Sequence, residues 1–494
     1  MTESDIERQT DRDSAASIEG EIPDIAHGKA PAVVRASLLV PMTIGATFFM
    51  EGLDSTIIAT SLPQIADSLN VSANEIGVTM TTYLISVSMW MAASGWLADR
   101  FEAKRVYVTA ITLFVIGSMV CGFSGNLTTL IVGRFIQGAG GAMMTPIGRL
   151  ILARSFPRDE LVRAMSYMII PGLLGPMVGP VVGGWITTYF DWPWIFFINV
   201  PLGILGIILG LRYLNPEPAE GTAKFDLVGF VLIAVSLVLL QGGFEFIAAD
   251  SGVELRAALA LGLGALGLVL YGSHIRRRDD PILDLKLFRY RSFAVAVLGG
   301  SFSRIVLGAT LFLFPLYFQL ALGATPFEAG LLMAVLAFGQ IAVRLAIDWL
   351  LNTFGVKVTL ISNSVVLGLL LFALLAFEPG SSLWLLGGFM FVFGLIHSVQ
   401  LSTLAAMNFS GLPSEVLGGA TSIAAVTQRL AMAVGITLTS ILLGFTSGGA
   451  TPGYRDFLLP VMALSAVMLL SVASFVILRG EDGADLLSKR AAKK

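Results

Sequence analysis

The chain has 494 residues, of which 55% are hydrophobic and only 13% are charged. A water-soluble domain of this length needs more charge to cover its surface, so the composition excludes an ordinary soluble protein and indicates an integral membrane protein. Cys121 is the single cysteine, which excludes a disulfide framework and cysteine-ligated metal sites. The net charge of −3 points to no particular class of partner.

The chain opens with a polar segment, residues 1–33, of mixed charge and without the short apolar core of a signal peptide. We expect a disordered cytoplasmic tail here. Apolar stretches of the length needed to cross a bilayer, roughly 20 helical residues, then recur along the chain. They lie near 36–61, 75–97, 106–124, 129–153, 164–188, 194–213, 227–248, 256–274, 293–322, 327–351, 357–377, 382–407, 417–444 and 456–478. The predicted fold class is therefore an all-α integral membrane protein with fourteen transmembrane helices.

The basic residues give the orientation. With the amino terminus inside, Lys and Arg fall almost entirely in cytoplasmic segments, and only Arg256 and Arg455 fall outside. Such asymmetry is what the positive-inside rule requires. Five arginines lie within the spans: Arg134, Arg149, Arg304, Arg344 and Arg429. The sequence predicts a multi-pass protein of the cell membrane with both termini in the cytoplasm.

An internal repeat suggests how the spans are organised. "GWLADRFEAKR" (95–105) follows the second span, and "DWLLNTFGVKV" (348–358) follows the tenth; the two share a tryptophan, a leucine, a phenylalanine and a lysine at equal positions. Parallel repeats are typical of transporters, with the substrate site at their interface. We expect a 6+2+6 arrangement. Its parts are an N-terminal six-helix bundle (34–214), a two-helix insertion (215–280), a C-terminal six-helix bundle (281–479) and a cytoplasmic tail (480–494).

Five motifs in order carry a family resemblance. They are "LDSTIIATSLP" (53–63), "GWLADRFEAKR" (95–105), "LIVGRFIQGAGGA" (130–142), "GLLGPMVGPVVGGW" (172–185) and "WPWIFFINVPLG" (192–203). With these, the chain resembles the fourteen-span drug:proton antiporters of the major facilitator superfamily over nearly its whole length. Glu102 departs from the pattern, because it stands where the loop motif has a turn glycine, and this substitution could strain the turn.

The resemblance implies roles for two sets of residues. It places an inner-gate latch on Asp99, which would meet Arg149 and the start of the thirteenth span near Gly418. A solvated loop charge is the alternative. The inner-gate motif comprises Gly95, Asp99, Arg100, Lys104 and Arg149.

The fifth-helix motif comprises Gly175, Pro176, Gly179, Pro180, Gly183 and Gly184. From the residues alone, the glycines form a stripe for close helix approach and the prolines weaken the backbone ladder. A hinge is favoured over plain tight packing.

Two carboxylates inside the first span are the leading functional candidates. Glu51 and Asp54 stand three residues apart, on one helical face, roughly 22 and 27 Å from the inner end. Arg134 is about 8 Å from the outer end of the fourth span, so it lies at a similar depth to Asp54. We predict that Asp54 carries a proton, with Glu51 tuning it or contacting substrate and Arg134 opposing it. The alternative is a static Asp54–Arg134 bridge.

Other polar residues within the spans give weaker signals. His397 and Gln400, with Gln137, are candidates for the cavity wall, although a packing histidine is an equal alternative. Arg304 and Arg429 lie near mid-membrane, where charge is costly, so each needs a partner or water.

These features predict a proton-coupled antiporter that exports small amphipathic or lipophilic compounds by alternating access, as in multidrug efflux. The alternative is a proton symporter or uniporter of a small metabolite. A membrane enzyme or sensor is not expected, because the sequence shows no soluble catalytic or signalling domain and no span carries a nucleophile–base or metal-ligand cluster. The lack of a nucleotide-binding loop excludes an intrinsic ATP-driven pump. The expected partners are protons, a small-molecule substrate and membrane lipid, with no cofactor, metal or nucleic acid, and the expected functional unit is a monomer.

Overall fold

The computed structural model describes the chain from residue 39 to residue 483 with gaps. The described ranges are 39–72, 75–156, 158–216, 225–248, 254–276, 285–343, 346–408, 410–413, 417–448, 450–479 and 482–483. Every regular element within these ranges is a helix, as the sequence predicted. The expected tails at 1–33 and 480–494 lie outside the described residues, apart from 482–483.

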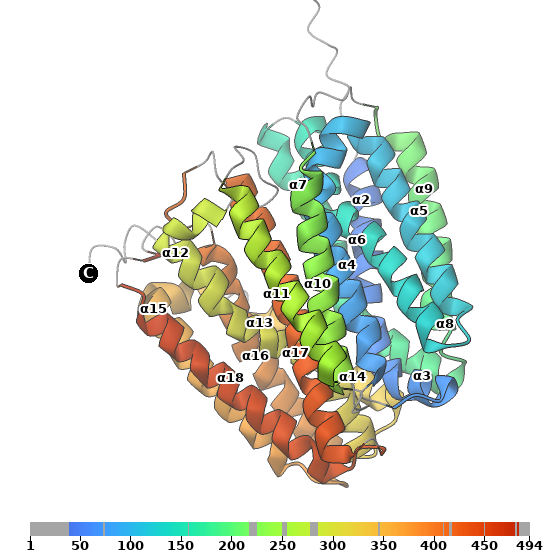
Figure 1. Cartoon of the computed structure of the whole chain (residues 1–494), viewed down its shortest axis with the longest axis vertical. Coiled ribbons are helices and arrows are strands. Elements are labelled where there is room, and N and C mark those ends of the chain that lie inside the picture. Colours follow the sequence, from blue (N-terminus) through green and yellow to red (C-terminus); the bar gives the residue numbers. More distant parts are fainter. Residues whose placement is uncertain are drawn as a thin grey trace, which may run out of the picture. The chain divides into compact units, whose positions relative to one another are not determined.

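Fifteen longer helices account for most of the described chain (Figure 1). They are α2 (Leu39–Ile57), α4 (Val78–Phe101), α5 (Ala103–Gly122), α6 (Leu127–Ser155), α7 (Arg158–Tyr189), α9 (Asn199–Tyr213), α10 (Leu227–Ala248), α11 (Glu254–Ile275), α13 (Gly300–Leu316), α14 (Pro326–Ala342), α15 (Ile347–Ala373), α16 (Leu383–Met407), α17 (Leu417–Ser447), α18 (Leu458–Val476) and the shorter α3 (Leu62–Leu69). Short helical pieces join them: η1 (Ile58–Ser61), η2 (Glu75–Gly77), α8 (Trp194–Phe197), η3 (Leu285–Arg289), α12 (Arg291–Ala294), η4 (Val295–Gly299), η5 (Tyr317–Ala321), η7 (Leu374–Ala376) and η9 (Tyr454–Phe457).

Ten helices in the described ranges are long and apolar enough to cross a membrane, and α14 is a shorter apolar helix. Three further helices, α2, α4 and α6, have 19, 24 and 29 residues but are less apolar. Their polar residues explain the difference: α2 carries Glu51 and Asp54, and α6 carries Arg134 and Gln137, all of them buried. The observed number is therefore ten, and fourteen spans remain a prediction.

The helices pack in two sets with the same pattern of neighbours. In the N-terminal set (α2–α9), α2 packs on α7, α4 on α6, and α5 on α9. In the C-terminal set (α12–α18), α13 packs on α17, α14 on α16, and α15 on α18. The two sets meet where α4 packs on α17 and where α7 packs on α14. In each set, the first long helix thus packs on the fifth, the second on the fourth and the third on the sixth.

The hairpin of α10 and α11 lies over one of these two seams. α10 contacts both α4 and α17, and Figure 1 shows α10 and α11 crossing in front of the junction between the sets. Gln241 of α10 donates from Nε2 to Thr81 Oγ1 of α4 at 2.9 Å and to Thr437 Oγ1 of α17 at 3.1 Å. One side chain therefore hydrogen-bonds both sets.

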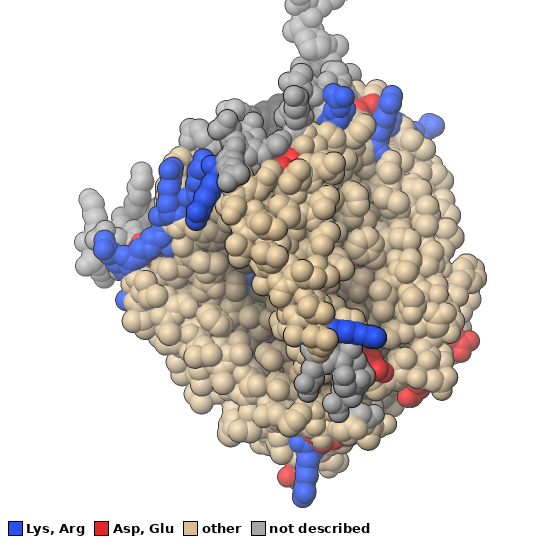
Figure 2. All heavy atoms as spheres, in the orientation of Figure 1, with Lys and Arg blue, Asp and Glu red and all other residues tan. Residues whose placement is uncertain are grey.

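The surface has the charge distribution of a membrane protein. Figure 2 shows wide uncharged areas, with Lys and Arg gathered mainly toward the upper and left margins of this face and few toward the lower end. Large apolar side chains are exposed on the outer faces of the helices, among them Leu259, Leu263 and Val269 of α11 and Leu369 of α15. Contact of these faces with lipid accounts for their exposure.

Candidate functional site

A buried polar network surrounds Asp54 in the N-terminal set. Asp54 is 0% exposed, and its Oδ2 lies 2.9 Å from Nη1 of Arg134, which is 1% exposed. Asp54 Oδ1 accepts hydrogen bonds from Gln137 Nε2 at 2.7 Å and from Asn199 Nδ2 at 2.8 Å. Ser118 of α5 accepts from the same two amide groups. Four helices, α2, α5, α6 and α9, thus converge on one carboxylate.

Local structure sets the position of Arg134. Asn126 caps α6 by accepting a hydrogen bond from the Thr129 backbone amide at 2.9 Å, which fixes where the helix begins. Arg134 follows two turns later, and its guanidinium lies 4.3 Å from the centre of the Tyr83 ring on α4. Its Nε also faces the Thr79 carbonyl at 3.4 Å. The arginine is held by a carboxylate, an amide, a carbonyl and an aromatic face.

The Asp54–Arg134 pair is therefore a well-satisfied buried ion pair. Removing one partner of such a pair typically costs about 3–5 kcal/mol, because the other charge is left buried without compensation. A proton on Asp54 would neutralise the carboxylate that these donors hold, so proton binding here requires the donors to rearrange. The direct contact agrees with the expectation that Asp54 and Arg134 lie at one depth. A static ion pair would make the same contacts, so they do not distinguish a proton carrier from a structural bridge.

Glu51 is in a different environment one helical turn away. Its Oε2 accepts a hydrogen bond from Thr145 Oγ1 at 2.7 Å, and its Oε1 lies 3.8 Å from Nη2 of Arg429. Arg429 belongs to α17 of the C-terminal set and is 26% exposed at its side chain. Among the ion pairs between described side chains, Glu51–Arg429 is the one that joins the two sets. The two carboxylates share a helix but face different counter-ions.

Two adjoining cavities lie between the sets, and Arg429 lines one of them. One has a volume of about 330 Å³ and the other about 250 Å³, and they share wall residues including Pro176, Gln340 and Gln428. The N-terminal set contributes Thr56 of α2 and Pro176, Met177 and Pro180 of α7, while the C-terminal set contributes the rest of the described wall. We call the two volumes together the central cavity.

The three residues expected on the cavity wall have different locations. His397 lines the cavity, with Nδ1 3.1 Å from Gln340 Nε2 and its ring against Phe393. Gln137 lies in the Asp54 network. Gln400 is fully buried within the C-terminal set, where Nε2 contacts Ser303 and Ser364 at 3.1 Å each. Of the three, only His397 borders the central cavity.

The glycines of the fifth-helix motif make the closest approach between α2 and α7. A Cβ added at Gly175 would lie 2.5 Å from the Phe49 carbonyl oxygen, and Cβ atoms at Gly179 and Gly183 would collide with Thr56 Oγ1 and the Ile57 carbonyl oxygen. Gly184 approaches the other set instead, at the Pro326 carbonyl.

The prolines of this motif lie within a continuous helix, α7. Since Pro180 has no N–H, the carbonyl of Pro176 lacks its helical donor. Thr56 Oγ1 on α2 donates to that carbonyl at 3.5 Å, and Thr60 Oγ1 donates to the Pro180 carbonyl at 3.3 Å. The glycines of this motif therefore pack α7 tightly against α2. Two carbonyls of its prolines accept hydrogen bonds from the threonine hydroxyls of the neighbouring segment.

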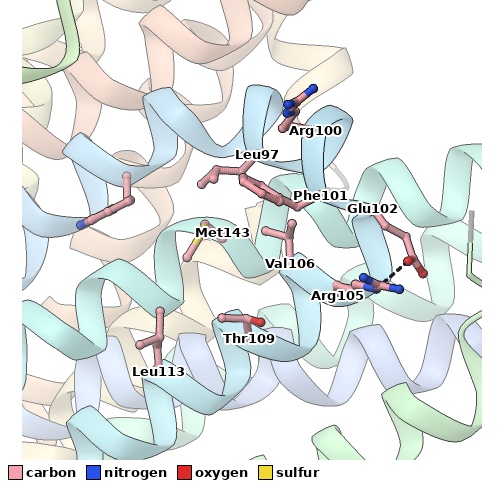
Figure 3. A pocket seen from close by; sticks show the side chains of 10 residues that line it. Leu97, Arg100, Phe101, Glu102, Arg105, Val106, Thr109, Leu113 and Met143 are labelled. Atoms are coloured by element: carbon pink, nitrogen blue, oxygen red, sulfur yellow. Dashed lines mark ion pairs between the residues drawn. The ribbon is translucent and has the colours of Figure 1, made fainter. Parts of the chain in front are cut away.

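The turn between α4 and α5 has an unusual backbone. Glu102 adopts φ +71° and ψ 123°, a region that suits glycine. Its carboxylate pairs with Arg105 at 2.9 Å, the contact drawn as a dashed line in Figure 3. The turn borders a pocket of about 690 Å³, lined by apolar side chains such as Leu97, Leu113 and Met143 and edged by Arg100 (Figure 3).

The second copy of this turn has the same geometry. Gly355, which aligns with Glu102, adopts φ +74°. Trp96 and Phe101 meet edge-on with centroids 5.8 Å apart, and Trp349 and Phe354 do so at 6.2 Å.

The lysines of the two turns also make equivalent contacts. Lys104 Nζ donates to the Leu211 carbonyl at 2.8 Å near the end of α9, and Lys357 Nζ donates to the Val476 and Leu478 carbonyls at the end of α18. The repeat in the sequence thus corresponds to a repeat in contacts.

The latch expected from Asp99 lies outside the described contacts, which include neither the Asp99 side chain nor the surroundings of Gly95 and Gly418. Arg149 is exposed near the carboxyl end of α6. The role of these residues stays a prediction.

The sequence analysis missed three residues that complete the site: Ser118, Thr145 and Asn199. Asn199 offered a signal, because it is the single amide in the apolar run "WIFFINVPLG" and is 0% exposed. Ser118 and Thr145 offered none, since small hydroxyl residues are common in such helices.

The family model described as "Major Facilitator Superfamily" matches residues 44–436, with a further match over 296–492. Curated relatives include MdtD proteins, which are named for multidrug resistance. The one from Pectobacterium atrosepticum is 34% identical over 459 residues, covering 91% of this chain and 96% of its own. The one from Escherichia coli O139:H28 is 34% identical over 437 residues, covering 87% and 92%.

Solved transporters share the fold at low sequence identity. A POT family transporter in complex with 5-aminolevulinic acid has a TM-score of 0.67 at 14% identity, covering 89% of this chain and 95% of its own. A D-xylose-proton symporter has a TM-score of 0.62 at 16% identity, covering 87% and 96%. Together with the family match, the all-helical fold and the internal repeat, these relationships show that the chain is a multi-pass membrane transporter of the major facilitator superfamily.

Proposed function

We propose that this transporter is a proton-coupled antiporter that exports small amphipathic or lipophilic compounds. The observation that carries the proposal is the buried carboxylate Asp54, held by Arg134, Gln137 and Asn199. Glu51 lies on the same helix, and its partner Arg429 lines a cavity that both helix sets border. A carboxylate inside a membrane protein is a candidate for proton transfer by default. The MdtD relatives, named for multidrug resistance, support efflux as the direction of transport.

In the proposed cycle, a proton binds to Asp54, which would then release Arg134. Glu51, one helical turn away, tunes this step or contacts substrate. Loss of the Glu51–Arg429 contact when substrate binds would remove an attraction between the two sets. Alternating access requires the sets to move against each other, and the glycine–proline stripe of α7 supplies a helix that can bend beside α2.

We further propose fourteen spans in a 6+2+6 arrangement, in a functional monomer of the cell membrane with both termini in the cytoplasm. The equivalent packing of α2–α9 and α12–α18 supports two six-helix bundles, with α10 and α11 as the insertion. Reporter fusions at residues 218 and 280 should give cytoplasmic signals, and one at residue 250 an external signal. Opposite signals from 218 and 280 would contradict the insertion.

The function is tested by transport in proteoliposomes with an imposed pH gradient, using a panel of dyes, drugs and small metabolites. An antiporter accumulates substrate on the side from which protons flow out. A symporter accumulates it on the opposite side, and a uniporter does not respond to the gradient. Symport or an absence of response to the gradient would contradict the antiporter proposal. Either result would favour the alternative, a symporter or uniporter of a small metabolite.

A further inference from the structure

Arg304 is a buried arginine in the middle of the helical segment Arg291–Ala321, about 20 Å from its start. Its side chain is 2% exposed. Nη1 donates to the carbonyl oxygens of Ala296 at 2.9 Å and Val297 at 3.3 Å, which belong to the π-helical turn η4. A π-turn interrupts the regular ladder of an α-helix, and here the arginine binds carbonyls within it. These contacts hold the guanidinium in place.

Arg304 differs from Arg134 and Arg429 in its counter-ion. Arg134 pairs with Asp54, and Arg429 pairs with Glu51. Within the described part of the chain, Arg304 has no carboxylate partner, and its Nε and Nη2 donate to no described residue. A charge at this depth is expected to have compensation from a partner or from an ion. The site therefore has one more positive charge than the described carboxylates balance.

The central cavity is where that compensation can come from. Arg304 lines the 330 Å³ part of the cavity, together with the polar side chains of Gln340, Ser398, Ser402 and Gln428. The remaining wall is apolar, and no Asp or Glu is among the described residues that line either part. The wall thus combines a fixed positive charge, hydrogen-bonding groups and apolar surface.

We propose that the central cavity binds an organic anion, with a carboxylate or sulfonate of the substrate against Arg304 and its apolar part against the wall of α7 and α14. This proposal rests on the proposed function and specifies its substrate class. A guanidinium binds planar oxyanions through paired N–H groups, and the pairing is strong where solvent is excluded. A lipophilic cation would instead be repelled by Arg304 and Arg429, because the described wall contains no carboxylate to attract it.

A purely structural role is the competing explanation, in which Arg304 only braces the π-turn. Binding of a substrate oxyanion needs the charge of the guanidinium in the cavity, whereas bracing needs only donors to two carbonyls. Arg304→Lys keeps the charge and one donor group, and Arg304→Gln keeps a donor without the charge. Comparing the two separates the explanations, and the Lys variant also covers a failure of the Gln variant to fold.

The test measures binding of two xanthene dyes of similar size, anionic fluorescein and a cationic rhodamine ester, to the purified protein by fluorescence anisotropy. Wild type should bind fluorescein more tightly than the rhodamine ester. Arg304→Gln should weaken fluorescein binding roughly tenfold or more, as expected for a lost charge-assisted bond in a desolvated site, while Arg304→Lys retains much of it. Arg291→Gln is the matched control, because Arg291 lies on the same helical segment but pairs with Asp482 at a partly exposed position.

Preference of the wild type for the rhodamine ester, or equal fluorescein binding by wild type and a folded Arg304→Gln, would overturn the proposal. The dye experiment is independent of antiport, which the proteoliposome assay measures. Uphill transport of a cation on a pH gradient without fluorescein binding would leave the antiporter standing and reject the anion site. Fluorescein binding that depends on Arg304, without any response to the gradient, would keep the anion site and reject antiport.

Discussion

The turn at Glu102 offers a prediction whose magnitude follows from the backbone. A non-glycine residue held at such a positive φ costs about 1–3 kcal/mol, so Glu102→Gly removes that strain. The substitution also loses the pair with Arg105, whose side chain is 80% exposed, so the pair contributes only about 0–1 kcal/mol. Glycine adds roughly 0.5–1 kcal/mol of unfolded-state entropy. The balance is a net stabilisation of roughly 0.5–1 kcal/mol.

The aligned turn supplies the reverse experiment. Gly355 adopts nearly the same φ, and a Cβ placed there meets nothing within 4 Å. Gly355→Ala therefore adds about 1–3 kcal/mol of backbone strain without a steric clash. The lower unfolded-state entropy of alanine offsets roughly 0.5–1 kcal/mol of this strain, so we expect a destabilisation of roughly 0.5–2 kcal/mol. Glu102→Gly removes backbone strain at a positive φ, and Gly355→Ala introduces it.

The assay is the half-life of folded, monodisperse protein at a fixed elevated temperature, because large membrane proteins unfold irreversibly and their stability is a rate. If the strain is released on unfolding, Glu102→Gly should lengthen the half-life by roughly two- to fivefold and Gly355→Ala should shorten it. Faster unfolding of Glu102→Gly, together with an unchanged Gly355→Ala, would show that backbone strain does not govern this turn.

Three further outcomes are expected. Asp54→Asn should bind substrate but lose its response to an imposed pH gradient in proteoliposomes, whereas Glu51→Gln should mainly change which substrates are accepted; gradient-driven uphill transport by Asp54→Asn would move the proton site elsewhere. Asp99→Asn should insert normally yet transport far more slowly, because the inner gate would lose a charge-assisted contact, and unchanged turnover would identify Asp99 as an ordinary loop residue. Gln241→Leu should shorten the thermal half-life, since each interhelical hydrogen bond contributes about 0.6 kcal/mol, and an unchanged half-life would show that the bridge between the sets contributes nothing.

The helical fold and the Asp54–Arg134 contact could be anticipated because they depend on quantities that a sequence contains. Span length, the distribution of basic residues and a rise of about 1.5 Å per residue placed the two charges at one depth. The repeat at the α4–α5 turn and in the first part of α15 was visible in four shared residues, and its contacts recur in both copies.

The contacts between the two sets could not be anticipated in the same way. The pairing of Glu51 with Arg429 joins residues far apart in the chain, and it depends on how α2 and α17 pack across the cavity. Gln400 was expected at the cavity but lies inside the C-terminal set, because helical periodicity does not tell which polar face points to the cavity and which to a neighbouring helix. Arg304 was recognised as needing compensation, but its lack of a described carboxylate partner emerged only from its surroundings.

The position of the α10–α11 hairpin has a consequence for compounds dissolved in the bilayer. α10 packs on α4 and α17 and covers the seam between them, whereas no described helix from outside the two sets packs closely on α7 and α14 at the other seam. A molecule that moves from the bilayer into the transporter therefore meets the α10–α11 hairpin on one flank. On the other flank it meets only the contact between α7 and α14. The insertion makes the two flanks unequal, so lateral entry from the membrane would be one-sided, through the flank where Gly184 meets Pro326 and Gly330 meets Pro180.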